Sequence, residues 1–270
     1  METIYDVAIV GSGPAGYSAS IYLSRYKLSN IIFGKMIGGT ISEAHKVCNY
    51  PGVCDVSGLE LGMKFQKQAT DQGAQIAIES VTDIKKENDL FNLFTDKGNN
   101  YLAKTVILAT GTDRNKLAIP KEDQYVGKGL SYCATCDAMF YKNKKVGVVG
   151  GSNAATMAAT MLADIASEVY IIYRGTELKG EPAWIEQVLQ KENVKTIFQT
   201  LVTDLEGEQR LQRVKLSKAY NDSDYLDLDG LFVEIGSEPN ITLPVKLNLA
   251  LDKQNYIEVD QRQATSINGV

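Results

Sequence analysis

The sequence has few of the features that mark secreted, membrane or nucleic-acid-binding proteins. Its 270 residues contain only four cysteines and one histidine, too few thiols for a small scaffold held together by disulfides. No apolar run approaches the roughly 20 residues of a membrane-spanning helix, and the first residues lack the basic and apolar regions of a signal peptide. No block of lysine and arginine is present, and the net charge is −5. These absences predict a cytoplasmic protein with neither a membrane nor a nucleic acid as partner.

What the sequence does contain is a strand–glycine–helix–strand pattern that occurs twice. The apolar run YDVAIV is followed by GSGPAG, an amphipathic segment and NIIFG, all within residues 5–34. A similar order, KKVGVVGG, SNAATMAATMLADIA and EVYIIYR, covers residues 144–174. Two such units predict an α/β protein with two Rossmann-like, three-layer (ββα) dinucleotide-binding domains. Between them, FNLFTDKGNNYLAK predicts a hairpin and RNKLAIPKEDQYVGKG a linker.

The first glycine loop matches the pattern G-x-G-x-x-G at Gly11, Gly13 and Gly16. The first glycine allows a tight turn, the second lets the backbone approach a pyrophosphate, and the third lets the helix pack close to the strand. The helix that follows presents free N–H groups and a positive dipole end to phosphates. The carboxylate expected about 20 residues later to bind a ribose is missing, because that strand ends at Phe33 and Gly34.

The second glycine loop is less regular. Gly150 and Gly151 occupy the first positions, whereas Ser152 stands at the second motif glycine and Ala155 at the third. A Cβ atom at Ser152 crowds the place where a phosphate would approach. Arg174, at the end of the next strand, either pairs with a 2′-phosphate or is a solvated charge, and both interpretations are open here.

The stretch SYCATCDAMF contains a Cys-x-x-Cys pair, Cys133 and Cys136, followed directly by Asp137. This spacing lowers a thiol pKa, and a dithiol exchanges two electrons, as do flavins and nicotinamides. Asp137 is either a general acid for a departing thiolate or an exposed residue that favours the helix dipole. A redox pair between two dinucleotide loops predicts an electron relay.

Zinc binding is the alternative use of a Cys-x-x-Cys pair. A structural zinc ion needs four ligands, and the remaining candidates are Cys48, Cys54 and His45. Their spacing is not that of a zinc knuckle, and they lie far upstream of the pair. We therefore expect no metal site, and we expect Cys48 and Cys54 to be ordinary thiols.

The sequence resembles the low-molecular-weight thioredoxin reductases, which are two-domain, FAD-dependent members of the pyridine nucleotide-disulfide oxidoreductases. The resemblance extends over nearly the whole chain. It is carried by VAIVGSGPAG, GKMIGGTI, NYPG, VILATGT, YCATCDAMFYKNKKVGVVGG, LFVEIGSEPN and YIEVDQRQATSINGV. The combination of CATCDA with a second dinucleotide loop is the most specific of these features.

The resemblance implies an FAD-binding domain at residues 1–116 and 242–270, with a nicotinamide-binding domain at 117–241 inserted into it. Hinges near 117–120 and 239–243 would let the inserted domain rotate. Cys136 would lie nearer the flavin, Cys133 would attack the disulfide of a thioredoxin- or glutaredoxin-like partner, and Asp137 would be the acid. A homodimer is also implied. Expected FAD contacts are Gly11, Ser12, Gly13, Pro14, Ala15, Gly16, Phe33, Gly34, Gly38, Gly39, Thr40, Asn49, Ala109, Thr110 and Gly111. Expected nicotinamide-dinucleotide contacts are Gly150, Gly151, Ser152, Asn153, Ala154 and Arg174.

Three departures from the family pattern leave alternatives open. Family members have a glycine at Ser152 and an acid at Asn153, and they have His-Arg-Arg where this chain reads YRG. The donor is therefore NADPH or another reductant such as a deazaflavin or ferredoxin. Members also continue past the INGV motif into a strand, a Gly-Asp motif and a helix, so we expect an incomplete FAD domain. The alternative function is a degenerate paralogue that binds nucleotide or a partner without turnover.

Overall fold

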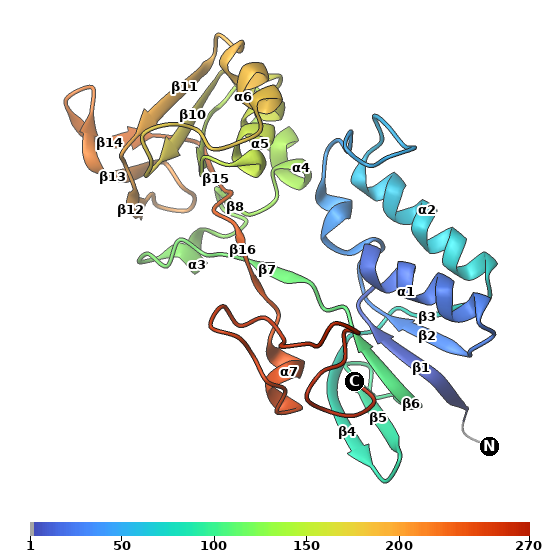
Figure 1. Ribbon diagram of the computed structural model, residues 1–270. Coiled ribbons are helices and arrows are strands. Elements are labelled where there is room, and N and C mark those ends of the chain that lie inside the picture. Colours follow the sequence, from blue (N-terminus) through green and yellow to red (C-terminus); the bar gives the residue numbers. More distant parts are fainter. Residues whose placement is uncertain (1–2) are drawn as a thin grey trace. The chain divides into compact units, whose positions relative to one another are not determined.

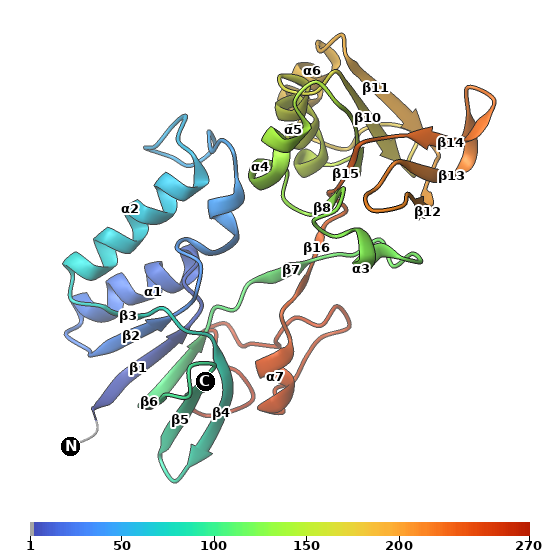
Figure 2. The same cartoon turned by 180° about the vertical axis from the view of Figure 1, so that it is seen from behind.

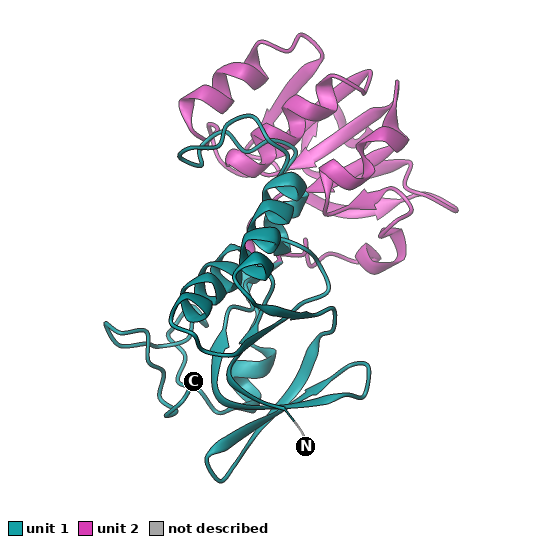
Figure 3. Cartoon of the chain, turned by 90° about the vertical axis from the view of Figure 1, so that its right-hand side faces the viewer, with its two compact units in different colours: residues 1–113, 238–270 teal, residues 114–237 magenta. Residues whose placement is uncertain are grey.

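The chain folds into two compact units. The structure, a computed structural model, describes residues 3–270. Unit 1 comprises residues 1–113 and 238–270, and unit 2 comprises residues 114–237 (Figure 3). Unit 2 is thus inserted into the chain of unit 1. The changes of unit fall a few residues before the boundaries expected from the sequence.

Unit 1 is built on a six-stranded sheet in the order β3-β2-β1-β6-β5-β4. β1, β2, β3 and β6 are parallel, and β5 is antiparallel to both β4 and β6. The last four residues of β1 are buried, as expected for a central parallel strand covered on both faces. The expected hairpin over residues 91–104 is confirmed as β5–β6. The strands are β1 (Ile4–Val10), β2 (Asn30–Phe33), β3 (Gln75–Ala77), β4 (Val81–Glu87), β5 (Leu90–Thr95) and β6 (Asn100–Leu108).

Helices cover both faces of this sheet (Figures 1 and 2). On one face, α1 (Pro14–Arg25) and α2 (Gly58–Asp71) bury Val7, Ile9 and Ile32. Proline at the first position of α1 presets the helical φ angle, and the Ser57 side chain caps α2 by accepting from the Glu60 N–H (3.2 Å). The other face packs against α7 (Thr242–Lys246) and residues 247–270. A short 3₁₀ helix, η1 (Gly39–Glu43), precedes α2.

Unit 2 is built on a parallel five-stranded sheet in the order β11-β10-β9-β15-β8. One face of this sheet packs against α5 (Asn153–Ala163) and α6 (Pro182–Leu189). The other face packs against a three-stranded antiparallel sheet, β12-β13-β14. The five-stranded sheet contains β8 (Leu130–Ser131), β9 (Lys145–Val149), β10 (Glu168–Tyr173), β11 (Val194–Phe198) and β15 (Gly230–Val233). The second sheet contains β12 (Val202–Glu206), β13 (Arg213–Tyr220) and β14 (Ser223–Asp227).

Three short helices complete unit 2: α3 (Glu122–Tyr125), α4 (Ala134–Asp137) and the 3₁₀ helix η2 (Ala138–Tyr141). The chain passes between the units in β7 (Thr112–Arg114) and β16 (Ser237–Pro239), which pair with each other. The expected α/β class with two Rossmann-like domains is confirmed. In each unit, a central parallel strand, β1 in unit 1 and β9 in unit 2, runs through a glycine turn into a helix.

Candidate functional site

The first glycine loop joins β1 to α1 in a tightly packed turn. Gly11 has φ +124°, and a Cβ built on it would lie 1.9 Å from the carbonyl oxygen of Ala109. A Cβ on Gly16 would lie 2.0 Å from the Gly11 carbonyl oxygen. Gly13 caps α1, with space around it: the nearest neighbour of a built Cβ is the Gly38 oxygen at 3.8 Å. Gly11 and Gly16 thus close the turn, while Gly13 leaves the helix N-terminus open to a ligand.

A second group of small residues surrounds this turn. A Cβ on Gly34 would lie 2.0 Å from the Ser12 Oγ, which donates a hydrogen bond to the Met36 carbonyl (2.8 Å). Gly38 and Gly39 have φ +83° and +59°, and a Cβ on Gly39 would lie 3.0 Å from the Gly13 Cα. These contacts hold the backbone at Gly34 and Gly39 against the first glycine turn. The result is a cradle of bare backbone, open at Gly13, which fits the pyrophosphate and ribose of a dinucleotide.

Tyr17 lies beneath this cradle and is 1% exposed. Burial raises the pKa of its phenol, while hydrogen bonds with the Gly38 backbone and the Ser12 side chain act in the opposite direction. A buried, neutral ring therefore supports the loops from below.

The remaining expected FAD contacts lie in three places. Pro14 and Ala15 form the first turn of α1, Phe33 ends β2, and Thr40 lies in η1, so all four border the cradle. Ala109, Thr110 and Gly111 follow β6, where Thr110 Oγ1 donates to the Asn240 carbonyl (3.3 Å) and Gly111 has φ +68°. Asn49 is exposed in the loop bounded by the Val47–Val56 bridge. The structure thus brings the residues on regular elements together and leaves Asn49 on a loop.

The second glycine loop joins β9 to α5. Gly150 has φ +144°, and a Cβ there would lie 2.2 Å from the Glu234 carbonyl oxygen. Ser152 is the N-cap residue of α5 and makes no side-chain hydrogen bond to the helix. Its backbone is extended (φ −98°), so a side chain is tolerated there without strain. The Asn153 Oδ1 accepts from the Glu181 N–H (2.6 Å), and its Nδ2 donates to the Glu181 Oε1 (3.0 Å). Asn153 is therefore used to hold a neighbouring loop, and Ala154 beside it is exposed.

Tyr173 occupies the position in unit 2 that Gly34 occupies in unit 1. Its ring lies between two glycines: a built Cβ would approach it to 2.5 Å from Gly151 and to 2.4 Å from Gly175. Arg174 follows at the surface and is exposed. The C-terminal end of β10 therefore carries an aromatic ring and one guanidinium group. At the corresponding end of β2 in unit 1, the backbone at Gly34 is bare.

The two redox-motif cysteines form a disulfide at the start of α4. Cys133 and Cys136 are bonded, with Cα atoms 5.3 Å apart, whereas Cys48 and Cys54 are exposed and free. The Cys136 backbone N–H donates to the Cys133 Sγ (3.2 Å). A backbone amide in this position favours negative charge on a sulfur atom.

Asp137 ends α4 and is half-buried. Burial, followed by the Asp137 carboxylate, raises the pKa of the neighbouring Tyr141. Sequence reasoning missed two residues here, Met139 and Phe140, which lie three and four positions after Cys136 and are 70% and 73% exposed. The sequence feature that could have revealed them is an apolar dipeptide close to a reactive cysteine motif.

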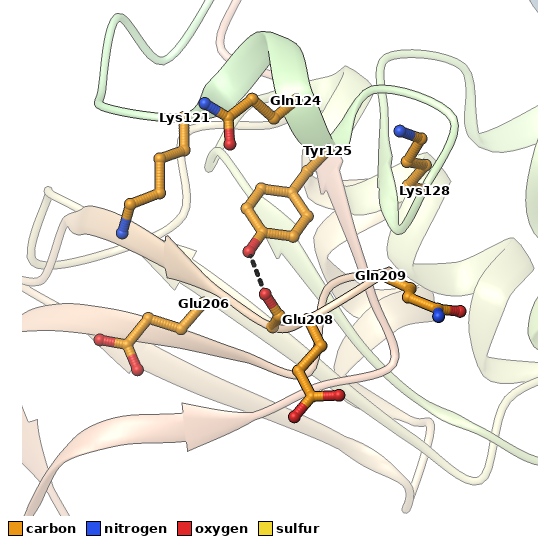
Figure 4. Close-up of a pocket in the computed structure, with 8 residues that line it drawn as sticks. Lys121, Gln124, Tyr125, Lys128, Glu206, Glu208 and Gln209 are labelled. Carbon is orange, nitrogen blue, oxygen red and sulfur yellow. Dashed lines mark hydrogen bonds between the residues drawn. The ribbon is translucent and has the colours of Figure 1, made fainter.

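A cavity of about 830 Å³ lies elsewhere in unit 2, between α3 and the β12–β13 connection (Figure 4). Lys121 and Lys128 face Glu206 and Glu208 around it, and the Tyr125 hydroxyl donates to the Gly207 carbonyl (2.8 Å). Its lining balances the two charge signs and lacks both a glycine loop and a nucleophile. It is therefore not the candidate redox site.

No group of three or more histidine, cysteine, aspartate or glutamate side chains within the described residues 3–270 is placed to hold a metal ion. Within the same range, no helix has the length and apolar character needed to cross a membrane.

Comparisons with known sequences match the whole chain. Residues 5–270 match the family described as pyridine nucleotide-disulphide oxidoreductase. A thioredoxin reductase of Mycoplasma genitalium is 38% identical over 99% of this chain and 86% of its own length. One of Treponema pallidum is 38% identical over 100% of this chain and 88% of its own length.

Solved structures agree with the sequence matches. The thioredoxin reductase of Lactococcus lactis superposes with a TM-score of 0.92 at 29% identity, covering 98% of this chain and 88% of that one. The thioredoxin reductase of T. acidophilum superposes with a TM-score of 0.91 at 34% identity, covering 99% and 88%.

The chain therefore belongs to the pyridine nucleotide-disulphide oxidoreductase family. It is an oxidoreductase of the flavin-dependent disulfide reductase type, and the Cys133–Cys136 disulfide is its redox centre. Thioredoxin reductases in this family use FAD and NADPH. The resemblance seen in the sequence is thus confirmed, and the redox interpretation of the cysteine pair takes precedence over zinc.

Proposed function

We propose that this enzyme reduces the disulfide of a thioredoxin- or glutaredoxin-like protein through Cys133 and Cys136. The observation that carries the proposal is the Cys133–Cys136 disulfide at the start of a short helix, followed by two exposed apolar side chains. The names of the relatives support thioredoxin as the partner.

Unit 1 is proposed to bind FAD in the cradle around Gly11, Gly13, Gly34 and Gly39. The bare backbone and the open N-terminus of α1 would hold the pyrophosphate, with Ala109–Gly111 alongside. When bound, FAD supplies a carrier that accepts and donates two electrons. The chain's own contribution is to bind and orient this group through backbone N–H groups and to keep bulky side chains away from it.

The reduced cysteine pair is proposed to act in two exchange steps. The Cys133 thiolate, stabilised by the Cys136 N–H, attacks one sulfur of the partner disulfide and forms a mixed disulfide, while the other partner sulfur leaves as a thiolate. The Cys136 thiolate then attacks the Cys133 sulfur and releases the second partner thiolate. Two protons neutralise the partner thiolates, and Asp137 is the proposed acid near the pair. The enzyme disulfide is thereby restored, with two electrons transferred.

Unit 2 is proposed to bind the nicotinamide donor at residues 150–154 and Arg174. The turn geometry at Gly150 and the N-terminus of α5 support a dinucleotide pyrophosphate. Arg174 is the proposed partner of a 2′-phosphate, which makes NADPH the donor. Stopped-flow flavin reduction with NADPH, NADH and a reduced low-potential donor in parallel tests this assignment. Reduction by the third donor alone contradicts it.

Met139 and Phe140 are proposed to contact the partner protein. Apolar side chains exposed to this extent next to a redox disulfide favour a docking patch. Because only Asp137 and Ala138 separate them from Cys136, a partner seated on them would have its disulfide near Cys133.

The enzyme is further proposed to act in the cytoplasm as a homodimer. Large apolar side chains are exposed on the outer surfaces of α1 and α2, among them Tyr22 (66%), Tyr26 (78%) and Met63 (53%). A second copy covering these helices would bury them. Sedimentation equilibrium of the wild type and of a Tyr26→Glu variant tests the dimer, since a monomeric wild type contradicts it.

The function itself is tested with Cys136→Ser. We expect reduction of the bound flavin by its donor to persist and turnover of the protein disulfide to be abolished, because the mixed disulfide cannot be resolved. Unchanged disulfide turnover would refute the relay. A purified wild type without the flavin absorbance band near about 450 nm also contradicts the proposal.

A further inference from the structure

A buried carboxylate joins the segment that enters unit 2 to the strand that leads to the redox cysteines. Glu122, the first residue of α3, is 5% exposed. One of its oxygens accepts from the Leu117 N–H (2.7 Å) and the other from the Ala118 N–H (2.8 Å). The Tyr132 hydroxyl donates to the same oxygen as Leu117. Three donors from two separate segments therefore satisfy one buried anion.

The entering segment is bent in a way that requires such support. Ala118 and Lys121 have φ +56° and +62°, a left-handed conformation that residues other than glycine rarely adopt. Such residues persist where the surroundings hold them in place. Both backbone amides that Glu122 binds lie in or next to this bend, so its carboxylate helps to hold the bend, together with the ion pair between Lys121 and Asp204.

The hydrogen bond between Glu122 and Tyr132 brings this group of contacts next to the redox disulfide. Tyr132 directly precedes Cys133, whose N–H donates to the Ser131 Oγ (3.0 Å). Burial, followed by the Glu122 carboxylate, raises the pKa of Tyr132 well above its usual range, so its hydroxyl remains a donor at all working pH values. The backbone that leads into Cys133 is therefore fixed to Glu122 through one side chain.

We propose that Glu122 is a positioning residue for the redox pair: its carboxylate locks the segment at 117–121 to Tyr132, so that the two move as one piece. This inference rests on the proposed function, in which the cysteine pair must meet first the flavin and then the partner disulfide by movement about the connecting segments. With Glu122 in place, movement of the entering segment carries the redox turn with it. Without Glu122, the turn that contains Cys133 and Cys136 is no longer held in a fixed position relative to residues 117–121. The cysteine pair then meets the flavin in the productive geometry less often.

Three variants test the proposal. Glu122→Gln places an amide donor against one of the bound backbone N–H groups, and Tyr132→Phe removes the hydroxyl while leaving the bend intact. Asp123→Asn is the matched control, since it makes the same charge change one residue away, at an exposed pair with Lys116. We expect Glu122→Gln and Tyr132→Phe to lower kcat with the protein disulfide about tenfold relative to Asp123→Asn, with KM unchanged.

Two further measurements separate positioning from loss of structure. Ferricyanide takes electrons from the flavin and bypasses the cysteines, so its reduction should be the same in all three variants. In the reduced protein, alkylation of Cys133 by a maleimide should be severalfold faster in Tyr132→Phe than in Asp123→Asn, because the turn is no longer fixed.

The outcomes are distinct. Equal kcat values and equal alkylation rates for Tyr132→Phe and Asp123→Asn overturn the inference, even if Glu122→Gln fails to fold. A parallel loss of ferricyanide reduction in Tyr132→Phe overturns it as well, since the defect would then lie in folding or flavin binding. If wild type reduces no protein disulfide, the proposed function fails, and the alkylation comparison still decides whether Glu122 positions the turn.

Discussion

The carbonyl oxygen of Ala109 lies where a side chain on Gly11 would have to be: a Cβ built on Gly11 would approach it to 1.9 Å. The two residues directly follow the neighbouring parallel strands β1 and β6, whose register pairs Val10 with Leu108. The dinucleotide turn of unit 1 therefore depends on contact between two segments about a hundred positions apart in the chain.

Substitution of Gly11 should damage flavin binding more than a positive φ angle alone would explain. Gly11→Ala meets both the backbone penalty and the clash with Ala109, so we expect unit 1 to lose about 2 kcal/mol or more of stability, together with most bound flavin. Gly73→Ala is the control, because Gly73 has φ +104° and open space around it, and should cost about 1 kcal/mol. Flavin absorbance per protein and thermal unfolding measure both effects. Equal losses in the two variants contradict the role of the Ala109 contact.

Removal of the Asp137 carboxyl should slow turnover without weakening partner binding. Asp137→Asn keeps the shape of the side chain but cannot deliver a proton, so we expect kcat with the protein disulfide to fall at least about tenfold and KM to stay the same. Steady-state kinetics from pH 6 to 9 measure this. If the variant keeps the wild-type kcat across that range, Asp137 is not the acid, and its role is to favour the helix dipole.

Truncation of the exposed apolar pair should affect only the macromolecular substrate. We expect the Met139→Ala, Phe140→Ala double variant to raise KM for the protein disulfide about tenfold and to leave reduction of a small aromatic disulfide unchanged. Leu189→Ala is the matched control, since Leu189 is 62% exposed on α6. If both substrates respond equally, the pair does not form a docking patch.

Acid stability of unit 2 should depend on Glu168. Hydrogen bonds from Lys195 and Tyr170 lower the pKa of its carboxyl from 4.5 to about 2. Because the folded-state pKa is depressed, the stabilisation is complete above about pH 4.5 and is lost as pH falls towards 2. Glu168→Gln should therefore be less stable than wild type at pH 7, by at most about 1 kcal/mol, and the difference should vanish near pH 2. Denaturant unfolding at several pH values measures this, and a gap that widens on acidification contradicts it.

The sequence was sufficient where a feature depends on neighbours along the chain. The turn at Gly11–Gly16 and the Cys133–Cys136 motif were predicted because strand, glycines, helix start and cysteines are consecutive. The hairpin over residues 91–104 was predicted for the same reason.

Features that depend on distant segments were not predicted. Residues 114–129 resemble a polar linker in sequence, yet they lie within unit 2, with Glu122 and Tyr125 buried. A glutamate in such a stretch is expected to face solvent. Only the fold shows that the Tyr132 hydroxyl and two backbone N–H groups in the bent segment donate hydrogen bonds to the Glu122 carboxylate. The packing of Tyr173 between Gly151 and Gly175 was likewise not predicted from the sequence, because nothing about these three residues taken singly indicates that they are in contact.

The insertion of unit 2 determines the order in which the units are completed during synthesis. The Val106 N–H on β6 donates to the Gly269 carbonyl (2.8 Å), and Lys86 on β4 donates to the Asn268 carbonyl (2.7 Å). Residues 114–237 are contiguous and acquire all their partners while the chain is still being translated. The strands of unit 1 emerge from the ribosome first, yet the face of their sheet that packs against residues 242–270 is covered only after unit 2 has been synthesised.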